Sequence, residues 1–166
     1  MRFRWISPSW IIASCLCWSS LVAYEPCNAP ALLQYGIGIF NTRRQRHRQP
    51  QGSIEYKWKP VIYTLRPIVG LMLTQKGSGY VYGGAGLDLF LSKRLVLTPS
   101  FAPGFYWRGN GKELGFPLEF RSSIELAAVF KTHARFGVQF YHISNASLGF
   151  KNPGEESFVL FLALPL

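Results

Sequence analysis

A histidine, a serine and a glutamate near the carboxyl terminus have the side chains needed for acyl transfer. His142 and Ser144 are separated by one residue, and two adjacent carboxylates, Glu155 and Glu156, follow a short stretch later. A hydroxyl nucleophile, an imidazole base and a carboxylate that orients the imidazole are the parts of a serine-esterase triad. These residues therefore predict nucleophilic catalysis, provided that the fold brings them to one place.

The alternation of side chains indicates which face these residues share, because successive side chains of a strand point to opposite faces. The row that contains His142 and Ser144 is otherwise apolar: Phe136, Val138 and Phe140. Glu156 has the parity of a second apolar row: Phe158, Leu160 and Leu162. Polar groups on an apolar surface cost free energy unless they are paired, which favours a functional role. The other interpretation is a harmless polar pair at the level of the lipid headgroups. Glu155 remains an alternative carboxylate, although parity favours Glu156.

Composition limits the classes of protein that can hold these residues. The chain has 166 residues, a formal net charge of +10, 48% apolar residues and only 16% charged residues. This length favours a single domain. The apolar content excludes a disordered polycation, and the 3 cysteines exclude a disulfide scaffold. The charge alone would suit a nucleic-acid binder, but Lys and Arg are scarce outside one cluster, so no nucleic-acid partner is expected.

The remaining sequence predicts strands that alternate between an apolar and a polar or glycine face. After residue 30 no window keeps helical spacing, whereas eight segments alternate with a period of two: residues 32–42, 52–59, 65–75, 79–91, 95–107, 115–130, 134–144 and 156–166. Such segments, separated by turn residues, are typical of an all-β, eight-stranded antiparallel transmembrane β-barrel. A soluble lipocalin-like barrel, with its apolar face inward, is the alternative. The prolines inside these segments argue against regular strands, because proline cannot donate to the ladder. They are Pro67, Pro99, Pro103 and Pro117.

The first residues resemble a secretory signal peptide. Arg2 and Arg4 precede a short apolar run, and small residues follow up to Ala23. The run falls short of the roughly 20 residues that a spanning helix needs. We therefore expect a cleaved signal peptide at residues 1–23 and a barrel domain at residues 24–166. Only Cys27 would remain after cleavage, so no intramolecular disulfide is expected.

A cluster of arginines follows the first predicted strand. If the amino terminus lies in the periplasm, this connection is a loop at the outer surface, where the outer leaflet is anionic lipopolysaccharide. Arginine binds phosphate through a planar, bidentate guanidinium. We therefore expect contacts with lipid phosphate from four residues, with a solvated charged loop as the simpler alternative: Arg43, Arg44, Arg46 and Arg48.

The carboxyl-terminal motif resembles one known family. Residues 142–146 (HISNA) and 152–156 (NPGEE) are similar to the His-x-Ser-Asn signature, followed by Asn, Gly and Glu, of the outer-membrane lipid A 3-O-deacylases, the PagL family. The resemblance implies that Ser144 is the nucleophile, His142 the general base and Glu156 the orienting acid. It also implies that Asn152 contributes to the oxyanion hole and that Asn145 is a structural or oxyanion neighbour.

The same resemblance implies a substrate, a place and an assembly state. The substrate would be the ester-linked 3-hydroxyacyl chain of lipid A, the location the outer membrane with the active site at the outer leaflet, and the assembly a homodimer. The triad supplies its own nucleophile and base, so neither a metal nor a cofactor is expected. His47 and His133 lie apart from any cluster of metal-ligating residues in the sequence.

Two other functions remain open from the sequence. A non-catalytic eight-stranded barrel could bind lipopolysaccharide or a host surface through its basic loops, which would explain the charge but leave the triad as coincidence. A soluble basic barrel that binds nucleic acid would explain the charge alone, and it would partition into water without detergent.

Overall fold

The computed structural model describes residues 29–43 and 47–166. The predicted signal peptide, Cys27, Arg44 and Arg46 lie outside these residues. No helix among the described residues is long and apolar enough to cross a membrane. The strands are β1 (Leu32–Phe40), β2 (Gln49–Lys57), β3 (Leu65–Thr74), β4 (Gly79–Leu87), β5 (Leu89–Ser92), β6 (Leu95–Trp107), β7 (Leu118–Val129), β8 (Arg135–Ser144) and β9 (Glu155–Pro165).

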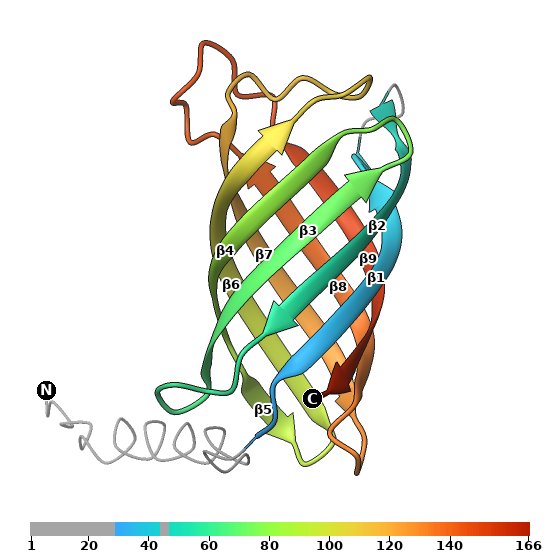
Figure 1. Cartoon of the computed structure of the whole chain (residues 1–166), viewed down its shortest axis with the longest axis vertical. Helices are drawn as coiled ribbons and strands as arrows, with labels where there is room; N and C mark the ends of the chain where they lie inside the picture. Colours follow the sequence, from blue (N-terminus) through green and yellow to red (C-terminus); the bar gives the residue numbers. More distant parts are fainter. Residues whose placement is uncertain (1–28, 44–46) are drawn as a thin grey trace, which may run out of the picture.

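The strands close into an antiparallel barrel (Figure 1). The hydrogen-bonded order is β4-β3-β2-β1-β9-β8-β7-β6-β5, and a β4–β6 pairing closes the ring. Strands β4 and β5 both pair with β6 and are separated only by Asp88, so together they count as one interrupted strand of the barrel. The predicted eight-stranded barrel is therefore confirmed.

The two ends of the barrel differ in their connections. The β1–β2, β3–β4, β6–β7 and β8–β9 connections lie at one end, which we call the loop end and which is at the top of Figure 1. The opposite end, here the turn end, carries the β2–β3, β5–β6 and β7–β8 turns and the carboxyl terminus. Strand β8 runs toward the loop end and β9 runs back, so Ser144 and Glu156 both lie at the loop end.

Most predicted bounds lie within two residues of the observed strand ends, with three larger differences. Strand β2 begins at Gln49, three residues earlier than expected, and so includes Pro50. Strand β7 begins only at Leu118. The segment predicted at residues 79–91 breaks at Asp88, whose carboxylate accepts hydrogen bonds inside the barrel from Arg66 at 2.7 Å and Arg135 at 2.8 Å. These buried contacts favour an interruption of the strand at Asp88.

Two of the prolines, Pro67 and Pro117, supply a carbonyl acceptor, and the other two lie on the outward parity of β6. The Pro67 carbonyl accepts the Trp58 N–H at 3.0 Å within the β2–β3 pair. Pro117 precedes β7, and its carbonyl accepts the Tyr106 N–H at 2.8 Å. Pro99 and Pro103 lie within β6, on the outward-facing parity that this strand shares with the exposed Phe101.

The two faces of the wall have the polarity of a membrane barrel. The outward row is apolar and exposed; the side chain of Ile37, for example, is 70% exposed. The interior holds buried ion pairs, such as Arg66 with Asp88 at 2.7 Å and Arg121 with Glu55 at 3.2 Å. A soluble lipocalin-like barrel would show the reverse arrangement. The side chains fill the interior of this small barrel, as is usual for eight strands.

Candidate active site

His142 and Glu156 face each other across two neighbouring strands on the outside of the barrel. They are directly opposite in the β8–β9 register. His142 Nδ1 lies 3.6 Å from Glu156 Oε1, and the two side chains are 42% and 23% exposed. This separation exceeds a hydrogen bond, but catalytic contacts are often long before substrate binds. With Nδ1 turned toward the carboxylate, Nε2 is the nitrogen available to a hydroxyl.

Ser144 lies on the same outward face, one same-face position further along β8 toward the loop end. His142 and Ser144 are half-buried, whereas Tyr141 and Ile143 point inward and are buried. The alternation therefore brings the predicted nucleophile and base onto the lipid-facing side. None of the three predicted triad side chains points into the lumen.

A fourth polar residue lies on this outer patch and was not predicted from the sequence. Ser122 on β7 is exposed and lies directly opposite His142 in the β7–β8 register. It is polar within an apolar outward row that contains Phe120 and Ile124. The parity argument that singled out His142 could have found it, but the pairing of β7 with β8 was needed to place it beside the imidazole.

The two adjacent glutamates have separate environments. Glu155 points into the barrel, is fully buried, and accepts hydrogen bonds from the Asn41 N–H at 3.1 Å and the Ser157 hydroxyl at 3.0 Å. Glu156 points outward toward His142. The geometry thus separates the two carboxylates that spacing alone left as alternatives, and only Glu156 faces the imidazole.

The β8–β9 loop is organised by the side chain of Asn145, which is fully buried. Its Nδ2 donates to the Leu114 carbonyl at 2.9 Å and to the Lys151 carbonyl at 2.8 Å. Its Oδ1 accepts the Ser147 N–H at 3.0 Å. Because these loop contacts occupy both ends of the amide, they favour the structural role among the two that the resemblance implied for Asn145.

Asn152 reaches back to the residue that follows the predicted nucleophile. Its Oδ1 accepts the backbone N–H of Asn145 at 3.2 Å. Only the oxygen of an amide can accept from an N–H, so this bond fixes the orientation of the amide and leaves Nδ2 as its donor. Asn152 itself is exposed at the surface of the loop. The amide is therefore tethered close to Ser144 with a donor to offer.

The loop holds this arrangement with an unusual backbone. Ala146 and Ser147 both have positive φ, 50° and 65°, which is costly for residues with a Cβ. At Gly115 of the neighbouring β6–β7 loop φ is 95°, and an added Cβ would lie 2.1 Å from the Lys151 carbonyl oxygen. The two loops are therefore pressed together beside Ser144, and glycine is required at that contact.

One arginine of the cluster, Arg43, lies beside the same carboxylate. Arg43 Nη1 is 3.7 Å from Glu156 Oε1, the oxygen that faces His142, and the arginine side chain is 80% exposed. Arg48 instead donates to the Thr42 carbonyl. Among the two arginines of the cluster that the structure describes, Arg43 is thus the one next to the candidate triad.

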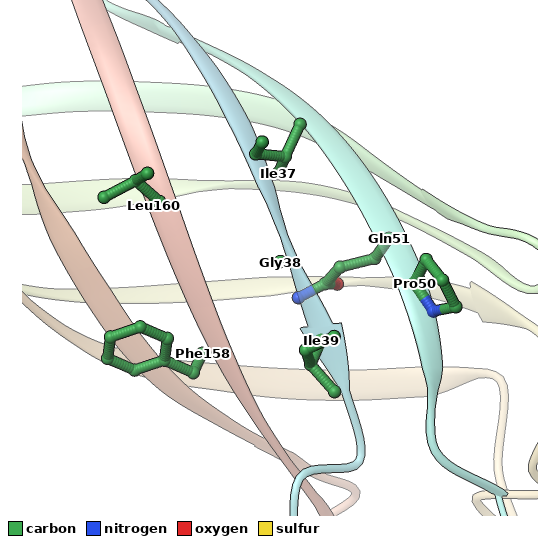
Figure 2. A pocket seen from close by; sticks show the side chains of 7 residues that line it. All are labelled: Ile37, Gly38, Ile39, Pro50, Gln51, Phe158 and Leu160. Atoms are coloured by element: carbon green, nitrogen blue, oxygen red, sulfur yellow. The ribbon is translucent and has the colours of Figure 1, made fainter.

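An apolar groove lies on the outer wall where β1, β2 and β9 run side by side (Figure 2). Its apolar lining comes from β1, β2 and β9: Ile37, Ile39, Pro50, Phe158 and Leu160. Phe158 follows Glu156 on the same face of β9 and pairs with Ile39 of β1. The groove therefore continues the outer patch from the carboxylate along the apolar wall.

With this geometry established, comparison with known proteins identifies the family. The model of the lipid A 3-O-deacylase (PagL) family matches residues 31–165, nearly the whole described chain. The chain belongs to the lipid A 3-O-deacylase (PagL) family. The resemblance inferred from the carboxyl-terminal motif is confirmed, and the activity of the PagL family is hydrolysis of a carboxylic ester. A search of curated proteins found no matching sequence.

Solved structures support the fold of this PagL family member. The crystal structure of the outer membrane enzyme PagL is similar with a TM-score of 0.63 and 18% identity, covering 81% of this chain and 99% of that one. A de novo designed transmembrane β-barrel gives 0.56 at 10% identity, covering 86% and 98%. The Yersinia pestis outer membrane protein Ail gives 0.50 at 9% identity, covering 82% and 99%. At these identities the likeness shows the fold alone.

Proposed function

We propose that this PagL family member is a serine esterase that removes the ester-linked 3-hydroxyacyl chain from the 3 position of lipid A. The observation that carries the proposal is the pairing of His142 with Glu156 across β8 and β9 on the lipid-facing surface, with Ser144 on the same face. A substrate whose acyl esters lie in the membrane can reach such a site laterally. A catalytic site inside the barrel could not be reached in this way.

In the proposed mechanism Ser144 is the nucleophile and His142 the base. The imidazole takes the hydroxyl proton as the Ser144 oxygen attacks the ester carbonyl, and Glu156 stabilises the imidazolium that forms. The sugar hydroxyl leaves with the proton returned by His142, and the acyl chain remains on Ser144. Water, deprotonated by the same imidazole, then attacks the acyl-enzyme and releases the 3-hydroxy fatty acid.

Neighbouring groups would bind the parts of the substrate that do not react. Asn152 Nδ2 is the proposed oxyanion donor, because its partner Oδ1 is tethered at the residue after Ser144. The groove of Ile37, Ile39, Pro50, Phe158 and Leu160 would hold an acyl chain by apolar contact. The arginine cluster, with Arg43 beside Glu156, would bind a lipid A phosphate.

The lengths of the connections support the proposed membrane orientation. Outer-membrane barrels have short periplasmic turns and longer extracellular loops. Because the β6–β7 and β8–β9 loops lie at the loop end, that end would face outward, with the triad at the level of the outer leaflet. Homodimer formation and removal of residues 1–23 as a signal peptide stay predictions.

A non-catalytic barrel that binds lipopolysaccharide through its arginine loop is the second candidate, favoured by the 80% exposure of the Arg43 side chain. Mass spectrometry of lipid A from cells with and without the protein separates the two. Loss of one hydroxyacyl chain in the expressing cells supports the esterase, whereas unchanged lipid A supports the binder.

Because the two glutamates have separate environments, we expect the same substitution to lower activity at one of them and to leave it nearly unchanged at the other. We expect Glu156→Gln to lower kcat for lipid A deacylation by about two to four orders of magnitude, because the amide no longer stabilises the imidazolium. Glu155→Gln is the matched control and should stay within about threefold of wild type, since its amide oxygen can still accept the Asn41 N–H. A larger loss in the Glu155 variant would contradict the assignment.

Removing the cation beside the triad should weaken recognition of phosphate. We expect Arg43→Ala to raise KM about tenfold for phosphorylated lipid A, the effect of one charge-assisted contact of roughly 1.5 kcal/mol. The KM for lipid A stripped of its phosphates should not change. Arg94→Ala, at the exposed turn end, is the control. Equal shifts for both substrates would show that Arg43 does not bind phosphate.

A further inference from the structure

A buried lysine joins three of the connections at the loop end. Lys112, in the β6–β7 loop, is 4% exposed. Its Nζ lies 2.8 Å from Oδ1 of Asn41, just after β1, and also donates to the carbonyl oxygen of Gly154, just before β9. The Tyr106 hydroxyl donates to the Lys112 carbonyl at 2.7 Å, so the backbone of the lysine is held as well.

Gly154 lies directly against the imidazole of His142. A Cβ added at Gly154 would lie 2.8 Å from His142 Cε1 and 3.3 Å from Nε2, and the glycine has a φ of 55°. Nε2 is the nitrogen that would take the Ser144 proton. Whatever fixes the backbone of Gly154 therefore fixes the surface against which the imidazole rests.

The same contacts hold the start of β9. The Asn41 N–H donates to Glu155 Oε2 at 3.1 Å, and the next residue, Thr42, donates its N–H to the Glu156 carbonyl at 2.8 Å. The end of β1 is thus bonded to both glutamates while Asn41 Oδ1 accepts from Lys112. The backbone that carries Glu156 and the backbone that supports His142 share one anchor.

A buried ammonium costs free energy unless it is compensated, so its place in the fold is informative. Lys57, another buried lysine, lies at the turn end and pairs with the carboxylates of Glu55 and Glu125. Lys112 donates to an amide and a main-chain oxygen on two loops that meet beside His142.

We propose that Lys112 is a positioning residue for the triad, which holds Gly154 and Asn41 together and so keeps His142 oriented toward Ser144. This inference rests on the proposed esterase function. It assigns a role to a lysine outside the His-x-Ser-Asn and Asn-Pro-Gly-Glu-Glu motifs, in a different loop from either.

The test compares Lys112→Met with wild type and with Lys57→Met, the matched loss of a buried lysine at the far end of the barrel. Each folded variant is assayed for kcat and KM with lipid A in detergent, and for the rate at which a fluorophosphonate labels Ser144. We expect Lys112→Met to lower kcat and the labelling rate by about 10- to 100-fold, with KM within threefold of wild type. Lys57→Met should leave kcat and labelling within threefold of wild type.

The outcomes separate the role of the lysine from the function itself. If wild type deacylates lipid A and Lys112→Met has wild-type kcat and labelling, the positioning role is wrong while the esterase stands. An equal loss in both lysine variants would show a general effect of barrel stability and would also overturn the positioning role. If Lys112→Met does not fold, Asn41→Gly, which tolerates the φ of 58° at this position, removes the other partner of the ammonium and should reproduce the kcat loss. An Asn41→Gly enzyme with wild-type kcat overturns the role. A wild-type protein without deacylase activity would overturn the proposed function.

Discussion

Substitution of Ser144 by alanine should reduce deacylation of purified lipid A by at least about a thousandfold in kcat, with little change in KM. The alanine removes the hydroxyl oxygen that is proposed to form the acyl-enzyme, but it leaves the outer patch of β8 and its apolar surroundings in place. Residual activity would come from the remaining binding and oxyanion contacts, as in other serine hydrolases that lose their nucleophile. The rate is measured by mass spectrometry of the released hydroxy fatty acid.

Ser92→Ala provides the control for this experiment. Ser92 ends β5 at the turn end, far along the wall from Ser144, and is also exposed. Its variant should deacylate lipid A at the wild-type rate. Near-normal activity of the Ser144 variant, with the barrel folded, would contradict a serine nucleophile at this position.

Substitution of His142 by alanine should cause a loss of similar size, about a thousandfold or more, because an unactivated serine hydroxyl is a weak nucleophile. His142 lies opposite Glu156 and on the same face as Ser144, so we expect the two residues to act as one unit. The double variant of His142 and Ser144 should therefore be no less active than either single variant. The measurement is a comparison of kcat for the two single variants and the double variant.

His133→Asn serves as the control, because His133 lies in the β7–β8 turn at the opposite end of the barrel and asparagine tolerates its φ of 65°. This variant should retain wild-type kcat. If the losses from His142→Ala and Ser144→Ala instead multiplied in the double variant, the two side chains would be acting independently and the shared proton transfer would be wrong.

The barrel could be predicted because alternation is a local property of the sequence. The rows that end at Ser144 and begin at Glu156 continue as the exposed outer faces of β8 and β9. The break at Asp88 could not be predicted in the same way, since it depends on Arg66 and Arg135 from other strands. The start of β2 was misplaced for a related reason, because the Pro50 carbonyl accepts the N–H of Gln75, just after β3.

The part of the candidate site that lies in short sequence motifs could be predicted from the sequence. Parity placed His142, Ser144 and Glu156 on one side of the wall before the register was known. Ser122 required the β7–β8 register, because nothing near it in sequence points to His142. The role of Lys112 could not be predicted because it depends on three loops that meet in the fold. The approach of Arg43 to Glu156 depends in the same way on the end of β1 lying beside the start of β9. Long-range pairing, which has no local signal, decided each of these.

The most direct test of the central claim is the mass of lipid A after incubation with the purified, detergent-folded protein and, in parallel, with its Ser144→Ala variant. A catalytic triad on the lipid-facing wall predicts that the wild-type protein removes one 3-hydroxyacyl chain from the 3 position and that the variant leaves lipid A intact. Unchanged lipid A with folded wild-type protein, or equal deacylation by both proteins, would contradict it.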